Sequence, residues 1–267
     1  MRRRAVVPAL AAVLASAPAA LGAQDVAALL AAGDSAYDAY RPAEAVGAFT
    51  AVLAIDSLRY DANWKAARSM VDIAKQITGK ADSLKRQRDS IYALAQGYAE
   101  RALRVDSTDA AAHFARALVL GQLSRTRGGK ERVRFARIIF DEAMRAIALD
   151  STHDGAHHIL GAWHAEVKRL SGISKFFAKT LFGGGFLDRG SWEAAIAHLE
   201  RAVALRPGYV FHRLELAEVL VDRKRYSEAR DLLATIPSLP QSDVMDAQYQ
   251  RDAAALAERI RDKRDGS

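Results

Sequence analysis

The sequence contains no cysteine among its 267 residues. This absence excludes disulfides, thiolate catalysis and cysteine metal sites together, so the fold must rely on its apolar core. Proline is scarce, and aromatic residues make up only 7% of the chain. No convincing run of alternating apolar and polar residues suggests a β-sheet, and no stretch beyond the N-terminus is apolar enough to span a membrane. Abundant alanine with few helix breakers therefore indicates an all-α protein.

The N-terminus has the features of a secretory signal peptide. Met1 to Arg4 supply positive charge, an apolar run follows from Ala5 to Ala20, and small residues lead to Ala23. We therefore expect residues 1–23 to be removed and the protein to be exported, to the periplasm or the cell envelope. The alternative is an uncleaved membrane anchor. Cleavage would remove three arginines and no acidic residue, which lowers the formal net charge from +7 to +4.

A four-residue helix ending recurs along the chain and marks a structural repeat. It reads AIDS at 54–57, RVDS at 104–107, ALDS at 148–151 and ALRP at 204–207. These spacings exceed the 34-residue unit of a tetratricopeptide repeat, and we place the excess between the two helices of repeats two, three and four. The expected helices and hairpins are 25–39 with 42–55, 61–77 with 90–105, 109–123 with 135–149, 154–207 and 209–234, followed by a capping helix over 243–261.

The clearest repeat lies between Asp154 and Pro207. Its first helix carries the Leu160-Gly161 pair, and its second helix has small and apolar residues at the usual positions. The pattern predicts an α-solenoid of about five tetratricopeptide-like helical hairpins with a C-terminal capping helix across 24–262. Residues 263–267 are expected to form a disordered tail.

Stacked hairpins curve into a concave groove that is lined mainly by their first helices. Such grooves usually hold an extended peptide or a partner helix. The first hypothesis is therefore a non-catalytic scaffold or adaptor that binds a segment of a protein partner, without cofactor or metal. The residues expected to line the groove are Trp64, His113, His157, Trp163, His164 and Arg213.

The inserts in repeats two, three and four are strongly basic. Residues 75–90 hold five basic and two acidic side chains, 122–137 hold six and one, and 168–190 hold five and one. Because the inserts occupy the same turn of their repeats, they are expected to form one basic edge. The alternative is that long exposed loops are simply solvated by lysine and arginine. The candidates are Lys85, Arg86, Arg88, Arg125, Arg127, Lys130, Arg132, Arg134, Lys175 and Lys179.

The third insert adds apolar residues to this charge. Residues 172–182 are predicted to form a short amphipathic helix that lies on a membrane or closes over the groove. The alternative is that Phe176 and Leu181 pack back on the solenoid. The second hypothesis is therefore a module that binds an anionic membrane or lipid. Nucleic acid is not expected, because aromatic residues do not interleave the first two basic inserts. The candidates for a membrane or lid insert are Phe176, Phe177, Phe182 and Phe186.

Four of the seven histidines lie close together in the sequence, at His153, His157, His158 and His164. With Glu166 they suggest a third, remote hypothesis, a metal-dependent enzyme. The HExxH spacing and the nucleophile elbow of hydrolases are both missing, so no catalytic residue is predicted.

The second half of the chain resembles the regulator of microtubule dynamics family of tetratricopeptide-like proteins. The resemblance covers about residues 150–260. It implies an adaptor or membrane-contact role without catalysis, whereas the exported character of this chain sets microtubules aside as its partner. The residues that carry it are His157, Leu160-Gly161, Trp163, Leu170-Ser171, Lys175, Ala178, Leu181-Phe182, the helix from Ala194 to Pro207, Glu228-Ala229-Arg230 and Leu239-Pro240.

Overall fold

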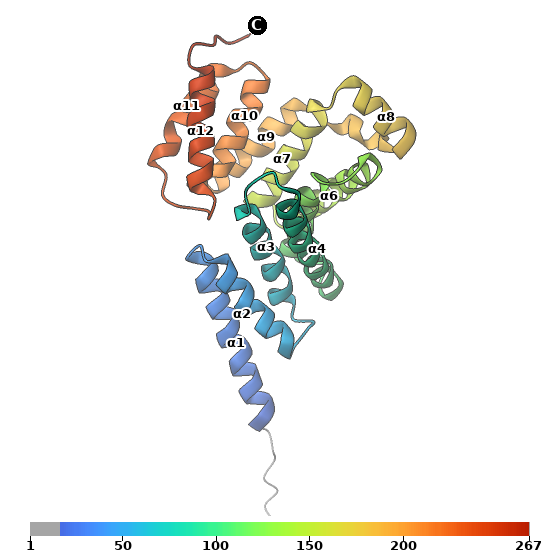
Figure 1. Ribbon diagram of the computed structural model, residues 1–267, viewed down its shortest axis with the longest axis vertical. Coiled ribbons are helices and arrows are strands. Elements are labelled where there is room, and N and C mark those ends of the chain that lie inside the picture. Colours follow the sequence, from blue (N-terminus) through green and yellow to red (C-terminus); the bar gives the residue numbers. More distant parts are fainter. Residues whose placement is uncertain (1–16, 267) are drawn as a thin grey trace, which may run out of the picture.

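The computed structural model describes residues 17–266, which form helices, turns and no strand (Figure 1). Residues 1–16, most of the predicted signal segment, lie outside the described residues, as do the side chains of 17–23 and of Phe177. Cleavage near Ala23 therefore stays a prediction. Among residues 17–266, no helix combines the length and the apolar character needed to cross a bilayer.

Five helical hairpins and a capping helix build residues 17–266, as the repeat pattern predicts. The hairpins are α1 (Ala17–Asp38) with α2 (Pro42–Ile55), α3 (Tyr60–Gln76) with α4 (Asp82–Val105), α5 (Ala110–Ser124) with α6 (Gly129–Leu149), α7 (Asp154–Arg169) with α9 (Trp192–Leu205), and α10 (Val210–Asp222) with α11 (Tyr226–Thr235). The insert of the fourth hairpin forms α8 (Gly172–Phe182) and the 3-10 helix η1 (Gly184–Arg189), and the C-terminal part forms η2 (Ile236–Ser238) and α12 (Asp246–Ile260). The all-α solenoid is confirmed.

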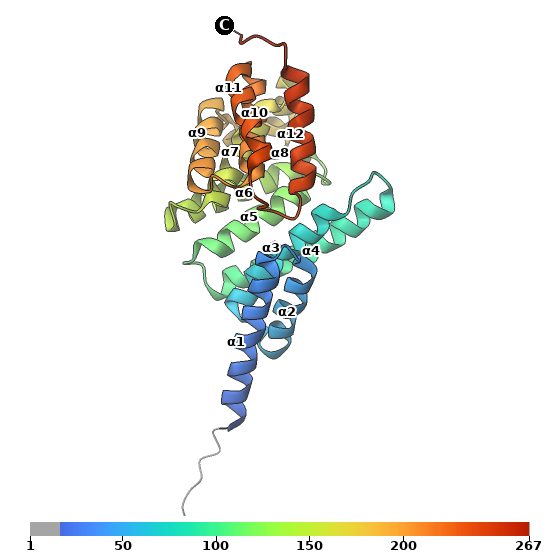
Figure 2. The ribbon, with the colours of Figure 1, turned by 90° about the vertical axis from the view of Figure 1, so that its left-hand side faces the viewer.

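The first helices of successive hairpins contact one another, from α1 through α3, α5, α7 and α10 to the cap α12. A curved stack brings the helices on its inner side closer to one another than the helices on its outer side. These helices therefore form the inner face of the solenoid. The stack winds so that the tip of the first hairpin comes close to the segment before α12 (Figures 1 and 2).

Close helix crossings hold each hairpin together. On α2, Phe49 and Val52 are fully buried, as the helical period predicts. Gly33 of α1 faces Phe49 so closely that an added Cβ would lie 2.4 Å from the phenyl ring. In the fourth hairpin Gly161 is similarly close to Leu199, at 2.7 Å. The two helices can approach because these positions have no side chain.

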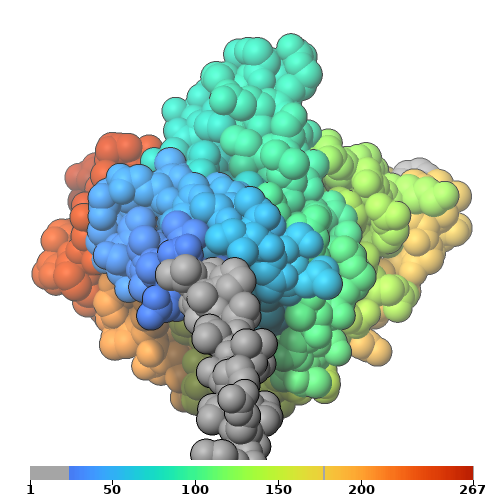
Figure 3. Space-filling model, turned by 90° about the horizontal axis from the view of Figure 1, so that it is seen from below, coloured from blue at the N-terminus to red at the C-terminus, as the bar shows by residue number. Residues whose placement is uncertain are grey.

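The first two basic inserts are largely helical, and the expected starts of the second helices near Ser90 and Phe135 were wrong. Helix α4 begins at Asp82 instead of near Ser90, and α6 begins at Gly129 instead of near Phe135. Both segments consist mainly of good helix formers without proline, and ion pairs between residues three apart join their turns. The N-terminal part of α4 consequently projects from the body of the molecule (Figures 2 and 3).

The third insert contains the predicted helix 172–182, now α8. Its start is capped by the Ser171 hydroxyl, which accepts the N–H of Ser174 at 3.2 Å, and Gly183 ends it with a left-handed backbone (φ 68°). The idea that Phe176 and Leu181 pack back on the solenoid was wrong, because these side chains are 62% and 63% exposed. Other residues anchor the insert: Ala178, Leu187 and, half-buried, Phe186 pack on the core.

The cap α12 packs against α10 and α11, with Leu256 and Ile260 buried. The described part of the C-terminal tail continues past it to the α10–α11 turn. There Asp265 accepts the backbone N–H and the hydroxyl of Ser227, and Gly266 donates its N–H to the Lys224 carbonyl at 3.1 Å. The tail predicted to be disordered thus has defined contacts as far as Gly266.

Candidate binding site on the inner face

Equivalent residues clamp the turns between hairpins, and three of them are predicted groove residues. Each donates a side-chain N–H to the carbonyl of the last residue in the recurring four-residue ending. The pairs are Asn63 with Ser57 at 3.1 Å, His113 with Ser107 at 3.0 Å, His157 with Ser151 at 3.2 Å and Arg213 with Pro207 at 2.8 Å. His113, His157 and Arg213 therefore have a structural role, each at its own inter-hairpin turn.

The side chains of Trp163 and His164 are also buried in packing contacts within the solenoid. The indole of Trp163 is 5% exposed and donates to the Ala136 carbonyl at 2.7 Å, and His164 is 7% exposed and accepts the N–H of Ser191 at 3.3 Å. Both lie on the face of α7 that meets α6 and α9. Since successive residues of a helix point about 100° apart, a small error in choosing the face exchanges lining residues for packing residues.

Trp64 is the predicted groove residue that does lie on the inner face. The guanidinium of Arg68 sits between two rings, 3.6 Å from the centroid of Tyr37 and 4.9 Å from that of Trp64. Trp64, Arg68, Asp72 and Lys75 recur every three or four residues along α3 and form one stripe. The last three were not among the predicted groove residues, although this spacing was visible in the sequence.

A group of polar side chains, here called the inner cluster, joins α1 and α3 to the segment before α12. It consists of Tyr37, Asp72, Lys75, Tyr209 and Asp243. Tyr37 donates to one carboxylate oxygen of Asp72 at 3.1 Å, Lys75 donates to the other at 3.2 Å, and Tyr209 donates to Asp243. Burial raises the pKa of the Asp72 carboxyl. Burial alone would lower the pKa of Lys75, but the charge of Asp72, together with the smaller effects of Tyr249, Tyr209 and Asp243, raises that pKa well above its usual value.

A cavity of about 300 Å³ opens beside the inner cluster, at the place where the two ends of the stack meet. The hydroxyl of Tyr40, in the α1–α2 turn, donates to the Gln241 carbonyl at 2.7 Å across this junction. We call it the end cavity. Its lining residues are Tyr37, Asp38, Tyr40, Pro42 and Asp72 from the first two hairpins, and Arg206, Tyr209, Ser242, Asp243 and Val244 from the other end.

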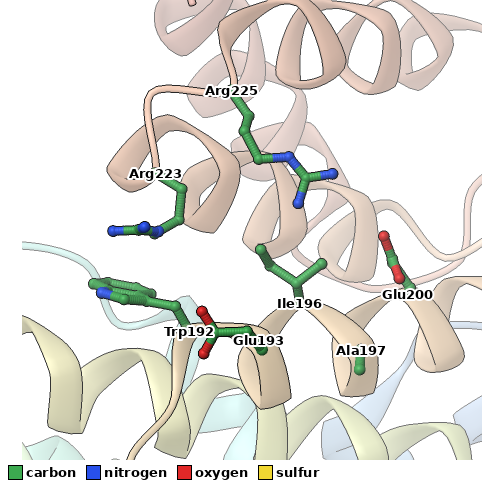
Figure 4. A pocket seen from close by; sticks show the side chains of 7 residues that line it. All are labelled: Trp192, Glu193, Ile196, Ala197, Glu200, Arg223 and Arg225. Atoms are coloured by element: carbon green, nitrogen blue, oxygen red, sulfur yellow. The ribbon is translucent and has the colours of Figure 1, made fainter. Parts of the chain in front are cut away.

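A second pocket, of about 400 Å³, lies between α9 and the α10–α11 turn, away from the inner face. Figure 4 shows Arg223 beside the indole of Trp192, with a distance of 5.7 Å to the ring centroid. We call it the outer pocket. Glu193, Ile196, Ala197, Glu200 and Arg225 complete its lining (Figure 4).

The three basic inserts touch one another in sequence order. Arg127 of the second pairs with Asp89 of the first at 3.1 Å, and the ring of Phe182 in the third packs over Gly129. Lys85, Arg88, Arg127, Arg134, Lys175 and Lys179 are held by carboxylates or carbonyls of the protein itself. Arg86, Arg125, Lys130 and Arg132 have no carboxylate within 4 Å in the described part of the chain, so they carry the available charge of this edge.

Histidines form paired contacts along α7, α9 and α10. His157 and His198 approach through their Nδ1 atoms at 3.0 Å, and so do His158 and His212. The Nε2–H groups of His157 and His212 donate elsewhere, the latter to Asp154 at 2.9 Å. Their Nδ1 atoms must therefore accept, and those of His198 and His158 must donate. This histidine seam comprises His153, His157, His158, His164, His198 and His212.

Burial lowers the pKa of every imidazole in the seam, to about 4 for His198, where the neighbouring His157 and His164 contribute as well. The seam therefore holds neutral rings at pH 7. Within residues 17–266 no three histidine, aspartate or glutamate side chains are placed to hold a metal ion together.

Comparison with known proteins identifies the family of this chain and agrees with its helical-repeat fold. The sequence pattern of the family described as regulator of microtubule dynamics protein 1-3 matches residues 29–261, nearly the whole solenoid. The chain belongs to this family. The match confirms the resemblance seen in residues 150–260 and extends it to the first three hairpins.

Curated relatives share about a quarter of their residues with the chain. Regulator of microtubule dynamics protein 3 of Rattus norvegicus is 27% identical over 200 residues, which are 74% of this chain and 41% of that protein. Protein 1 of Bos taurus is 27% identical over 201 residues, which are 75% of this chain and 62% of that protein. The chain thus spans less than two thirds of either relative.

Solved structures share the fold. A thermophilic tetratricopeptide-repeat protein of Thermus thermophilus superposes with a TM-score of 0.60 at 16% identity, covering 86% of this chain and 99% of that one. The pilF protein of Pseudomonas aeruginosa gives a TM-score of 0.53 at 14% identity, covering 90% and 92%. The repeat architecture is therefore shared with tetratricopeptide proteins of very different sequence.

Proposed function

We propose that this protein is a non-catalytic scaffold that binds an extended segment of a protein partner along its inner face. The observation that carries the proposal is the stripe of Trp64, Arg68, Asp72 and Lys75 on α3, which leads into the end cavity. Aromatic and arginine side chains are enriched where proteins bind one another. The first helix of a hairpin packs against its neighbours through small residues. On α3, the stripe adds large aromatic and charged side chains on the side that faces the inner surface of the solenoid.

Peptide selection on the full chain tests the proposal. Peptides selected from a random displayed library are expected to lose about tenfold in affinity with Arg68→Ala, because its guanidinium lies between two rings of the inner face. The matched control Arg223→Ala removes an arginine beside the indole of the outer pocket and should leave binding unchanged. Selected peptides that respond only to Arg223→Ala would move the binding site to the outer pocket.

A second candidate function is docking to an anionic membrane through α8. Ile173 and Leu181 are 73% and 63% exposed on this helix, and the neighbouring start of α6 carries Lys130 and Arg132 without carboxylates within 4 Å among residues 17–266. Exposed apolar side chains beside unpaired positive charge suit a surface of acidic lipids, where each basic residue contributes about 1 kcal/mol.

Co-sedimentation with vesicles of phosphatidylglycerol or phosphatidylcholine tests this docking. We expect binding to the anionic vesicles only, with loss at high salt and with Ile173→Asp plus Leu181→Asp. Leu58→Asp is the control, since Leu58 is 61% exposed but lies in the α2–α3 turn. Equal binding to both vesicle types, or equal loss with the control, would count against a role for α8.

We further propose that the protein is exported, on the strength of the basic and apolar segment before Ala23. N-terminal sequencing of protein purified from the expressing cell is expected to begin close to Gln24. A start at the first residues in membrane-bound material would favour an uncleaved anchor.

A further inference from the structure

The walls of the end cavity are suited to a positively charged group. Tyr37, Tyr40 and Tyr209 line it, and the faces of tyrosine rings attract cations within about 6 Å of the ring centroid. Two of these rings already hold guanidinium groups of the protein. Arg68 lies 3.6 Å from the centroid of Tyr37, and Arg206 lies 4.4 Å from that of Tyr209.

The lining also carries more negative than positive charge. Asp38, Asp72 and Asp243 stand against the single basic residue Arg206. Lys75, which does not line the cavity, forms an ion pair with Asp72. No basic group among residues 17–266 lies within 4 Å of Asp38 or Asp243. The lining itself therefore carries a net negative charge, which Lys75 and Arg68 offset from behind Asp72 and Tyr37.

A buried carboxylate directly behind the lining adds to this negative charge. Asp246 is 4% exposed and accepts the backbone N–H groups of Ser242 and Asp243 through Oδ2. Its Oδ1 is buried and has no hydrogen-bond partner in the described part of the chain. A buried carboxylate oxygen without a donor is costly, and a cation bound nearby offsets part of that cost.

The size and position of the cavity restrict the ligand. A volume of about 300 Å³ is at the lower end of ligand pockets, so it suits the end of one side chain. Tyrosine faces stack on a weakly hydrated guanidinium and offer little to a strongly hydrated metal ion. The cavity lies on the inner face, where an extended partner segment would pass.

We propose that the end cavity binds the guanidinium group of an arginine side chain in the partner segment. This inference rests on the proposed function, since it assigns one subsite of the inner face. The planar group would lie against the tyrosine rings and donate hydrogen bonds to Asp243 and Asp38, which belong to opposite ends of the stack.

Titration of the full chain with N-acetyl-arginine amide, followed by amide NMR signals, tests the subsite. The signals of Tyr40 and Ser242 are expected to shift with the arginine probe, and not with the neutral citrulline analogue. Asp243→Asn and, separately, Asp38→Asn should weaken the probe by about tenfold, because each removes one charged acceptor. Asp38 is exposed, so its variant keeps the test valid if Asp243→Asn unfolds. Glu200→Gln, at the outer pocket, is the control for loss of one negative charge.

Two results would overturn the subsite: equal binding of the arginine and citrulline probes, or an unchanged arginine affinity in both aspartate variants. A selected peptide that depends on Arg68 but not on Asp38 or Asp243 would also overturn it, while the proposed function would stand. Arginine binding that depends on the aspartates, together with no selectable peptide, would support the subsite and count against the proposed function.

Discussion

Gly161 shows how a missing side chain sets the distance between two helices. A Cβ at this position would lie 2.7 Å from Leu199 Cγ and 3.0 Å from the Ala195 carbonyl oxygen, so part of the obstacle is backbone that cannot rotate away. We expect Gly161→Ala to lower the free energy of unfolding by about 1–3 kcal/mol through overpacking. Urea denaturation with circular dichroism would measure the change.

Gly97→Ala is the matched control for this prediction. Gly97 also lies within a helix, α4, but nothing is within 4 Å of an added Cβ. Alanine should therefore raise the free energy of unfolding by about 0.5–1 kcal/mol, because it restricts the unfolded chain more than glycine does. Effects of the same sign in the two variants would argue against tight crossing at Gly161.

His157 illustrates the turn clamp that recurs between hairpins. It donates to Ser151 and accepts from His198, and it is 8% exposed. His157→Ala would leave the Ser151 carbonyl and the His198 N–H without these partners, at a cost of about 1–3 kcal/mol in unfolding free energy. Urea denaturation would measure it, with the less buried clamp variant Arg213→Ala as the smaller comparison. An unchanged stability of His157→Ala would contradict the structural role.

Five of the six predicted groove residues have clamping or packing roles instead, for a physical reason. Histidine and tryptophan on a helix suggest binding residues. A histidine whose buried imidazole donates to a backbone carbonyl cannot be told from a binding histidine by the sequence alone. Residue type alone does not separate the face of α7 that carries His157 and His164 from the adjacent face that carries His158. The polar stripe on α3 was accessible from its spacing, whereas its meeting with Tyr209 and Asp243 depends on the curvature of the whole stack.

At the scale of elements, the histidine seam makes the packing of α7, α9 and α10 sensitive to acid. The folded pKa values of its imidazoles lie below the value of about 6.5 expected for the unfolded chain. The unfolded state therefore binds more protons as pH falls. The stability contributed by the neutral rings is complete above pH 6.5 and is lost as pH decreases toward about 4, the pKa of His198.

Urea denaturation at pH 7 and pH 5 tests this acid sensitivity. We expect the midpoint to fall clearly at pH 5 and the fall to be smaller in His198→Asn, which removes the imidazole with the pKa of about 4. The comparison between variants matters, because carboxylates of the chain also gain protons in this range. An identical pH dependence of the variant and the parent chain would contradict the assignment to the seam.

Element boundaries were predictable where a local signal exists. Pro42 begins α2, and Ser171 and Gly183 bound α8. The starts of α4 and α6 were misplaced because a charged segment without proline has the composition of both a solvated loop and an exposed helix. The exposed sides of Ile173 and Leu181 were unpredictable for a related reason: an amphipathic pattern identifies an apolar face but not what covers it.

At the scale of the whole molecule, the hydrogen bond between Tyr40 and Gln241 joins residues 201 positions apart. The distance across this contact can be measured between two introduced cysteines that carry spin labels, because the chain has no native cysteine that would also be labelled. Spin labels at Ala39→Cys and Ser238→Cys are expected to give a narrow distance distribution by electron paramagnetic resonance, which broadens in Tyr40→Phe. Labels at Ala39→Cys and Ala54→Cys, within the first hairpin, should not respond. A broad distribution in the parent chain would show that the two ends separate in solution.

The solenoid itself was the most predictable level, since the recurring ending fixes the number of hairpins and each hairpin contacts mainly its neighbours. The closure between its two ends was not predictable from the sequence, because small rotations at every repeat add up and decide whether the first and last turns meet.

That closure bears on how fast a partner can associate. When the first hairpin touches the segment before α12, the inner face is enclosed on that side, and a segment must thread through or wait for the contact to open. Association that needs such an opening is slower than the roughly 10⁵–10⁷ M⁻¹s⁻¹ of rigid surfaces. A linear segment with a free end would enter without opening the ring, whereas the same sequence held in a loop would depend on it.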